Sequence, residues 1–474
     1  MSNFVFYDFE TSSSNKYWGQ IIQIGAILTN DNLEELDRYE ARCRLSPSII
    51  PEAMALIVNK SSPKMLKGAN LSHYEMIRQF VETLKGWGKA TYIGYNSIDF
   101  DEEFLRNTLF QTLEYAYLTS TNGNNRGDLL NLARAANLYY PNTLKNSISD
   151  KGNAVYKLDQ MAPLNGIEHS DAHSAIGDVI ATLGIAKIIA KKAPSVWKSS
   201  LRTTNKDETL KIIKNELYFC TNEYFYGKSR PYVQAYVCQH PKFQWAKCFD
   251  LRHDPQIYLD MPVADLKVAM GKNPKFLRTV RHNKHPIIMN PSYGNEFDEY
   301  KMIGAEKLAS RAKMIKDNTK FAEKISQILQ DEVEEKEQTK SQEDIYEEES
   351  IYTKFTSNED NKMMPEFHKA EWDKKLLVLG KIKDERLHYF GRRLIYEERP
   401  EALPKGEYNL IRASIAKRLL STNNERWNTI SRTYSEIDTL REKFEREGKP
   451  ENLIILDDIN AYVEEMEKFY NQPS

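Results

Sequence analysis

The feature that most constrains this chain is a strand-like run near its start, FVFYDFETSS at residues 4–13. Its aromatic and aliphatic residues predict a buried strand, yet Asp8 and Glu10 interrupt it. Side chains at i and i+2 of a strand point to the same face, so the two carboxylates converge at an electrostatic cost unless a cation neutralises them. Hard divalent cations such as Mg²⁺ take carboxylate oxygens as ligands. The alternative for this pair alone is an edge strand with two solvated acids.

Two further acidic sites follow along the chain. In YIGYNSIDFDEEF, residues 92–104, we expect Asp99 to cap a helix and Asp101 to lie in its first turn. In GIEHSDAHSAIGDVIATLGIAK, residues 166–187, Asp178 lies on a long amphipathic helix, with His173 near the N-terminal end and His169 as the rival histidine. The spacing of His173 and Asp178 is not the i,i+4 spacing that places two side chains on one helix face. Each site alone has an ordinary explanation, because acids are common at helix starts.

Length and composition describe an ordinary globular protein of several domains. A chain of 474 residues is too long for a single core. No apolar run approaches the roughly 18 residues that span a bilayer, and the N-terminus lacks the basic region of a signal peptide. The four cysteines form no Cys-x-x-Cys pair, which argues against a zinc site or a disulfide framework. We therefore expect a reduced, cytoplasmic protein that does not enter membranes.

Three regions differ in character. Residues 1–195 alternate strand-like and helix-like segments, which predicts an α/β layer fold. Residues 196–350 begin with short aromatic segments typical of a β-rich unit, of which the last is PQIYLDMP; one helix, AEKLASRAKMIKDNTKFAEKISQIL, and an acidic linker at 331–350 follow. Residues 351–474 are predicted to be helical. The linker holds ten acids and two lysines, so the rest of the chain carries a net positive charge that the overall −2 conceals.

Taken together, the three acidic sites form a specific pattern. An Asp-x-Glu on the first strand, an Asp after Asn-x-x-x-Phe, and a His-x-x-x-x-Asp on a late helix resemble the histidine-containing (DEDDh) branch of the DEDD exonuclease superfamily. Within it, YDFET, GYNSIDFDEEF, NRGDLLNLARA and the 165–187 segment are similar to the bacterial exodeoxyribonuclease I family. The resemblance continues weakly through NKHPII and YFGRRL. It implies an RNase H-like exonuclease domain, a β-rich SH3-like domain and an all-α C-terminal domain.

The resemblance also implies an activity. It predicts a 3′-to-5′ exonuclease that degrades single-stranded DNA to 5′-mononucleotides by two-metal-ion hydrolysis, in DNA repair and recombination. The expected cofactor is a pair of Mg²⁺ ions, with Mn²⁺ as a substitute. Their ligands would be Asp8, Glu10, Asp101 and Asp178, with Glu10 also touching the substrate. His173 would be the general base, since a histidine pKa lies near working pH.

Contacts with the DNA strand are implied at a further group of cationic and aromatic residues. Those near the acidic motifs are Arg106, Tyr117, Arg134, Tyr156 and Lys157. Lys157 stands where the family has arginine, and Tyr117 falls in a segment that aligns only with a gap. The basic stretch at 272–286, with Phe276 interleaved, predicts a groove wall made by Lys275, Arg278 and Arg281; Arg392 and Arg393 are similar candidates.

The expected partners are single-stranded DNA and the acidic tail of single-stranded-DNA-binding protein, with the chain as a monomer. The arginines of the family's pocket for that tail are not all found; Ala305 and Glu306 occupy part of the region.

Two alternatives remain from other classes of function. A DEDDh RNase or proofreading subunit usually ends soon after the His-x-x-x-x-Asp helix, whereas about 290 residues follow it here. A non-catalytic single-strand-binding module need not retain four carboxylates and a histidine. Release of mononucleotides from a labelled 3′ end would discriminate between these alternatives.

Overall fold

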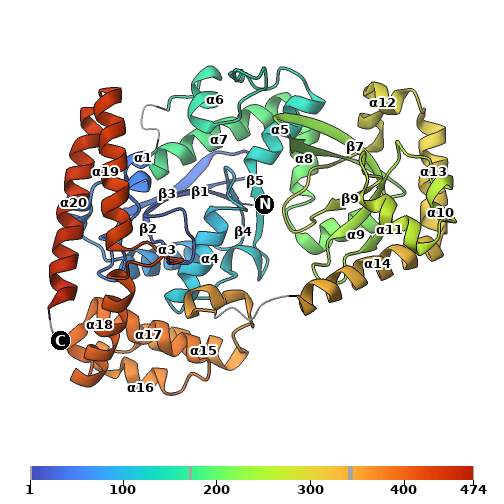
Figure 1. Ribbon diagram of the computed structural model, residues 1–474. Coiled ribbons are helices and arrows are strands. Elements are labelled where there is room, and N and C mark those ends of the chain that lie inside the picture. Colours follow the sequence, from blue (N-terminus) through green and yellow to red (C-terminus); the bar gives the residue numbers. More distant parts are fainter. Residues whose placement is uncertain (1–2, 170–172, 340–344, 473–474) are drawn as a thin grey trace.

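The computed structural model describes residues 3–169, 173–339 and 345–472. Figure 1 shows a central sheet with its helices, a second sheet unit on one side, and helices of the C-terminal region along the other side and below. In the described part of the chain, no helix is both long enough and apolar enough to cross a membrane.

The central sheet carries the N-terminal motif on its middle strand. Its order is β3-β2-β1-β4-β5, with β1 antiparallel to β2 and parallel to β4. The strands are β1 (Asn3–Thr11), β2 (Ile21–Thr29), β3 (Glu35–Arg42), β4 (Ala90–Gly94) and β5 (Asn125–Asp128). The mixed sheet between helices confirms the expected α/β layer fold.

Helices cover both faces of this sheet. The helices of the first region are α1 (Ala53–Val58), α2 (Pro63–Lys67), α3 (His73–Trp87), α4 (Asp101–Gln111), η1 (Leu118–Ser120), α5 (Leu129–Tyr139), α6 (Leu158–Leu164) and α7 (Ala175–Lys192). Val5 and Tyr7 of β1 share a core with α3 and α4, whereas Phe4 and Phe6 share one with α5 and α7. Since alternate strand residues share a face, Asp8 and Glu10 lie on the α7 side.

The middle region contains a second, antiparallel sheet of order β10-β6-β7-β8-β9. Its strands are β6 (Phe219–Phe225), β7 (Lys228–Gln239), β8 (Ala246–Asp250), β9 (Leu277–Val280) and β10 (Ile288–Met289). The helices around it are α8 (Pro194–Leu201), α9 (Lys206–Asn215), α10 (Gln256–Leu259), α11 (Val263–Gly271), η2 (Pro291–Glu296), α12 (Asp298–Lys301), α13 (Ala305–Asp317) and α14 (Thr319–Gln338).

Two expectations for the middle region are wrong. PQIYLDMP contains the short helix α10, where Pro255 is the N-cap and the Asp254 side chain accepts from the Gln256 N–H at 3.2 Å. The single helix expected after the strands is divided at Asn318, whose side chain caps α14 by accepting from the Phe321 N–H at 2.9 Å. Local side-chain capping ends one helix and starts the next despite a continuous helical pattern.

The C-terminal region is all-helical, as expected. It consists of η3 (Glu347–Tyr352), α15 (Asn358–Lys369), η4 (Trp372–Lys374), α16 (Lys375–Leu379), α17 (Glu385–Glu398), η5 (Pro400–Ala402), α18 (Lys405–Leu419), α19 (Ile430–Glu447) and α20 (Pro450–Asn471). The last two helices pack side by side at one end of the molecule (Figure 1).

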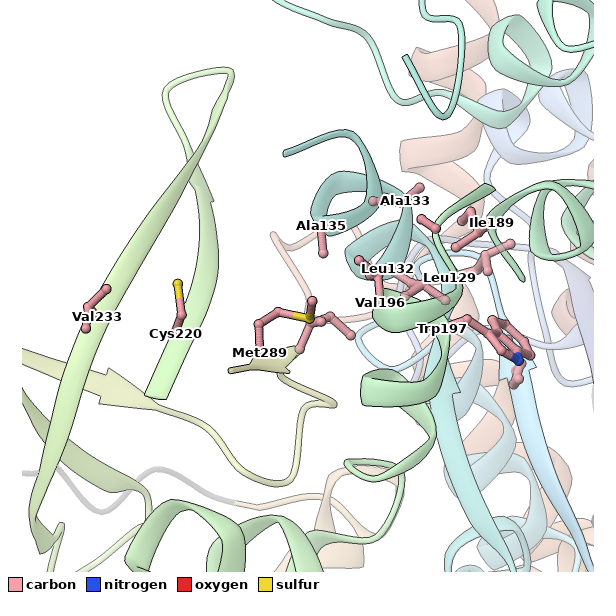
Figure 2. Packing of buried hydrophobic residues seen from close by; sticks show 14 of the residues in the cluster. Leu129, Leu132, Ala133, Ala135, Ile189, Val196, Trp197, Cys220, Val233 and Met289 are labelled. Carbon is pink, nitrogen blue, oxygen red and sulfur yellow. The ribbon is translucent and has the colours of Figure 1, made fainter. Parts of the chain in front are cut away.

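Two hydrophobic clusters join the regions. One runs from Phe4 and Leu132 of the central sheet layer to Val233 and Met289 of the second sheet; Figure 2 shows Met289 between α5 and the strands that carry Cys220 and Val233. The other joins helices of the first region to the C-terminal helices. The first region therefore shares a hydrophobic core with each of the other two.

The acidic segment at 331–350 differs from the expected linker. Its first eight residues continue α14, and Glu347–Tyr352 form η3. Glu348 is 1% exposed and accepts from Tyr389, Arg393 and Arg418. Much of the predicted linker is therefore packed structure; residues 340–344 of that prediction lie outside the described part of the chain.

Candidate metal centre and nucleic-acid surface

The acidic site is built around the end of β1. Pairing of β1 with β4 covers only Asn3 to Phe6, so the strand continues past β4 toward Glu10. There the Phe9 backbone N–H donates to Oδ1 of Asp101 at 3.2 Å, which holds the first residue of α4 against β1. The sheet register thus brings residues 8–10 and residue 101 together.

A close approach of α7 supplies the next carboxylate. Gly25 pairs with Asp8 across β1 and β2, and a Cβ at Gly25 would lie 2.5 Å from the Ala175 carbonyl carbon and the Ile176 nitrogen. Only glycine lets the start of α7 come this near the sheet. One ligand atom each of Asp8, Glu10 and Asp178 consequently lie within 4.8 Å of one another.

The electrostatics of these acids favour a bound cation. Burial, followed by repulsion from Asp101, Asp178 and Glu10, raises the pKa of Asp8 well above its usual value. Burial is also the main cause that raises the pKa of Glu10 to about 8, with Asp178 and Asp101 adding to it. Burial raises the pKa of Asp101 to about 8 against the Phe9 N–H, which lowers it. Because hard divalent cations prefer carboxylate oxygens, this donor set fits Mg²⁺ or Mn²⁺.

The two histidines occupy different positions. His173 is partly buried, has a φ of 67°, and directly precedes Ser174, whose side chain caps α7. His169 contacts one of the acids directly, with Nε2 2.6 Å from Oδ1 of Asp178. The rival histidine therefore contacts a carboxylate of the set, a contact that sequence spacing gave no means to predict.

The remaining acids of the second motif lie away from this cluster. The N-cap of α4 is Phe100, so the expectation for Asp99 is wrong; its carboxylate instead pairs with Lys284 at 2.7 Å. Glu102 is fully buried and accepts from Arg106, Arg126 and Thr119. The buried charge of Glu102 is thus neutralised within the fold.

Residues expected to contact DNA form two groups. The first surrounds Tyr224 of β6: the Arg134 guanidinium lies 3.9 Å from the centre of its ring, and the ring centre of Tyr156 is 5.9 Å away. Exposed Lys157 follows directly and occupies the N-cap position of α6, without a capping hydrogen bond from its side chain. Tyr224 was not predicted; its position in an aromatic strand was the available signal.

The second group lines a cavity of about 780 Å³ among all three regions. Arg106 lies 5.2 Å from the ring centre of Tyr117, which in turn is 5.7 Å from exposed Phe355. Because Arg106 also pairs with buried Glu102, much of its charge is already neutralised. Tyr117 and Phe355 are the better stacking surfaces of this cavity.

The basic stretch forms one wall of a separate cleft of about 850 Å³. The basic cleft, as we name it, is lined by Lys247, Lys267, Lys275, Arg278, Arg281 and Lys284. The predicted role of Phe276 is wrong, since it is 1% exposed and packs against Phe249 in the core. Lys247 and Lys267 were missed because they lie outside the basic stretch.

Three of the predicted arginines are already engaged within the fold. Arg278 donates from Nε to Glu223 at 2.9 Å and lies over the Tyr232 ring. Arg392 pairs with Glu407 at 3.2 Å, and Arg393 pairs with buried Glu348 at 3.0 Å. Neither Arg392 nor Arg393 is among the described residues that line these two cavities. Arg281, over the Trp245 ring, remains exposed at the cleft.

Two parts of this chain match models of known protein families. Residues 5–186 match the exonuclease family model, and residues 343–466 match the model of the exonuclease I C-terminal domain. The chain thus carries an exonuclease domain followed by an exonuclease I C-terminal domain. Curated relatives include exodeoxyribonuclease I of Buchnera aphidicola subsp. Acyrthosiphon pisum, 30% identical over 213 residues. That match covers 44% of this chain and 51% of the relative, so the chain spans about half the length of this relative.

Solved structures extend the similarity in fold to almost the whole chain. Exonuclease I from Methylocaldum szegediense superimposes with a TM-score of 0.82 at 20% identity, covering 98% of this chain and all of that one. Escherichia coli exonuclease I in complex with a dA16 oligonucleotide gives a TM-score of 0.81 at 18% identity, with the same coverage of both chains. At these identities the likeness concerns the fold.

Proposed function

We propose that this protein is a 3′-to-5′ exonuclease that degrades single-stranded DNA to 5′-mononucleotides, in DNA repair and recombination. The observation that carries the proposal is the convergence of Asp8, Glu10 and Asp178 within 4.8 Å, with Asp101 held beside them by the Phe9 N–H. Buried acids with raised pKa values gather where a cation or a reaction uses them. The matches to the exonuclease and exonuclease I C-terminal domain models support the same activity.

Asp8, Glu10, Asp101 and Asp178 are the residues that would hold two Mg²⁺ ions, or Mn²⁺ in their place. Bound there, the ions would activate a water and stabilise the leaving oxygen of an in-line displacement. His173 is the proposed general base; it directly precedes Ser174, the N-cap of the helix whose first turn carries Asp178. Glu10 is the acid proposed also to touch the substrate.

The DNA strand is proposed to follow the basic cleft and the aromatic residues beside the acids. Lys275, Arg281 and the Arg134–Tyr224 pair offer cations and ring faces, the combination that binds single strands without sequence preference. Tyr156 and Lys157 extend this surface. Arg106 and Tyr117 provide a second contact region in the cavity among the three regions. Arg278 would contribute less, since Glu223 already neutralises it.

The proposed domains are an exonuclease domain at 1–195, an SH3-like domain with its helical extension at 196–350, and a helical domain at 351–474. The five-stranded antiparallel sheet supports the middle assignment. We propose a monomer that also meets single-stranded-DNA-binding protein through its acidic tail; a structural relative is named as an SSB/exonuclease I complex. The cytoplasmic location stays a prediction, in keeping with four buried, free cysteines.

One experiment tests the activity. The full chain is incubated with 5′-labelled and 3′-labelled DNA and RNA strands, with Mg²⁺ and with chelator. We expect mononucleotides from the 3′ end of DNA, with Mg²⁺ only. Faster digestion of RNA would favour a DEDDh RNase, and binding of DNA without cleavage would favour a non-catalytic single-strand-binding module; either result contradicts the proposal.

A further inference from the structure

The middle region reaches into the first region through one buried histidine. His285 is 4% exposed; its Nδ1 accepts from the Asp128 backbone N–H at 2.9 Å, and its Nε2 lies 3.0 Å from the Ser200 carbonyl oxygen. Burial lowers the pKa of His285 to about 4, so the ring is neutral and can accept at one nitrogen while donating at the other. A Cβ at Gly127 would lie 3.2 Å from this ring, so the fit is close.

Asp128, at the other end of this contact, organises the loop before the acidic site. Its carboxylate accepts from the backbone N–H groups of Asn96 at 3.1 Å and Ile98 at 3.2 Å. These residues belong to the loop at 95–100, which connects β4 to α4 and ends directly before Asp101. His285 therefore holds Asp128 in place through the Asp128 backbone, and the Asp128 carboxylate holds this loop.

Lys284 holds the same loop from its other side. Its Nζ donates to the Ile98 carbonyl oxygen at 3.2 Å and pairs with the Asp99 carboxylate at 2.7 Å. Two consecutive residues of the middle region thus hold the 95–100 loop. Lys284 contacts its backbone and its acidic side chain, Asp99, and His285 contacts Asp128, which binds the loop in turn. We call this pair the Lys284–His285 clasp.

We propose that Lys284 and His285 are positioning residues for the metal site, acting through the 95–100 loop on Asp101. Asp101 is the first residue of α4, so its carboxylate moves with the end of this loop. Residues that orient metal ligands typically change metal affinity or activity by 10–100-fold when they are removed. The inference rests on the proposed function in one respect, namely that Asp101 holds a metal.

A competing role exists for Lys284, because it also lines the basic cleft. There it could bind a DNA phosphate, and its loss would then weaken DNA binding without moving the metal site. His285 is buried and offers no such contact. Comparing variants of the two residues therefore distinguishes a role in positioning the metal ligand from a role in binding DNA phosphate.

The test uses the full chain with Lys284→Met, Lys284→Arg, His285→Asn and His285→Ala, and Lys313→Met as a control at an exposed lysine of α13. Binding of Mn²⁺ without DNA is followed by the EPR signal of the free ion. Affinity for a fluorescent dT oligonucleotide is measured separately in chelator. Melting temperatures show whether each variant is folded.

We expect Lys284→Met and His285→Ala to raise the Mn²⁺ concentration for half-saturation by roughly 10-fold. His285→Ala should leave oligonucleotide affinity in chelator little changed, because His285 is buried, whereas Lys284→Met also removes a cation from the basic cleft and is expected to lower it. Lys284→Arg should retain most of the wild-type affinity, and His285→Asn should fall between, since its amide oxygen can still accept from Asp128. If His285→Ala does not fold, the proposal is tested with Lys284→Met and Asp99→Asn, because each of them removes the ion pair between Lys284 and Asp99.

The clasp is overturned if the Mn²⁺ titration of Lys284→Met matches the wild type, whether or not its oligonucleotide complex is weakened. The titration needs no nuclease activity. If the wild type cuts no nucleic acid but the clasp variants still lose Mn²⁺, the proposed function fails and the positioning role stands.

Discussion

At the scale of single residues, the charged forms of the buried carboxylates destabilise the folded protein when no metal is bound. Burial raises the pKa values of Glu10 and Asp101 to about 8, above the ~4 of such acids in an unfolded chain. The folded protein then binds more protons than the unfolded chain between these values, so its stability without metal should fall as pH rises from about 4 to about 8. Saturating Mn²⁺ should remove most of this fall.

Asp8→Asn tests this account. Removing one of the converging charges should raise the melting temperature in chelator at about pH 8 and flatten its fall with pH, while metal-dependent cleavage is lost. Thermal unfolding from about pH 5 to about pH 9 measures the effect. Glu323→Gln, at an exposed position of α14, is the control. A variant that cleaves at the wild-type rate would contradict the two-metal assignment.

The choice of general base is also decided at this scale. His173→Ala should lower kcat by roughly 10²–10⁴-fold while DNA affinity in chelator persists. His169→Ala should be milder in kcat and should act mainly on metal affinity, because Nε2 contacts Asp178. Single-turnover rates at saturating Mg²⁺ separate the two. If His169→Ala proves the costlier change under these conditions, His169 is the base.

At the scale of elements, η3 fastens the C-terminal helices through one buried acid. Glu348 accepts from Tyr389 at 2.8 Å, Arg393 at 3.0 Å and Arg418 at 2.9 Å. Glu348→Ala would leave two partly buried arginines without this partner, and removal of one side of a buried ion pair typically costs about 3–5 kcal/mol. Denaturant unfolding measures the loss. Glu347→Ala, at the exposed neighbouring position, should change stability little; equal effects of the two would contradict the account.

Elements with a strong pattern were predictable from sequence, whereas those set by local caps or remote contacts were not. The predictions of strand β1 and the long helix α7 are confirmed, because in each element the apolar residues that form the sequence pattern are the ones buried in the core. The α10 helix was missed because a four-residue helix between prolines has too little periodicity to detect. Glu348 was assigned to a linker because sequence does not show that Arg393 and Arg418 lie beside it.

The site follows the same division. That Asp8, Glu10, Asp101 and Asp178 belong together could be predicted from motif order, and the structure brings them together. The role of Gly25 could not, because the close approach of α7 depends on the sheet register. Phe276 was misplaced for a related reason: an aromatic residue among lysines suits a groove or a core equally, and only the fold decides.

At the scale of the whole molecule, the three regions depend on one another. The ring centres of Phe110 in α4 and Phe390 in α17 are 5.2 Å apart, and the two hydrophobic clusters cross the region boundaries. Residues 1–195 alone would expose part of both clusters and would lack the Lys284–His285 clasp. Tests of DNA retention therefore belong in the full chain, with the basic cleft altered at its surface.

Charge reversal in the basic cleft should change how long the enzyme stays on DNA without stopping the chemistry. Lys275→Glu and Arg281→Glu alter side chains at the cleft surface, away from the acidic set. Each phosphate contact that is lost should reduce the log–log salt dependence of single-strand binding by about 0.7. Arg278→Glu is a poorer probe, because it would also leave Glu223 facing a second acid.

The decisive measurement is digestion of a long labelled strand after unlabelled competitor has been added as a trap. An enzyme that is retained by distributed phosphate and base contacts continues through the trap, whereas one that has lost them dissociates after a few cuts. For the Lys275→Glu/Arg281→Glu double variant, we expect few nucleotides to be removed per binding event (short run lengths), with near-normal cleavage of short oligonucleotides. Lys313→Glu on α13 is the matched control for added negative charge. Run lengths equal to the wild type in the double variant would place the DNA path outside the basic cleft.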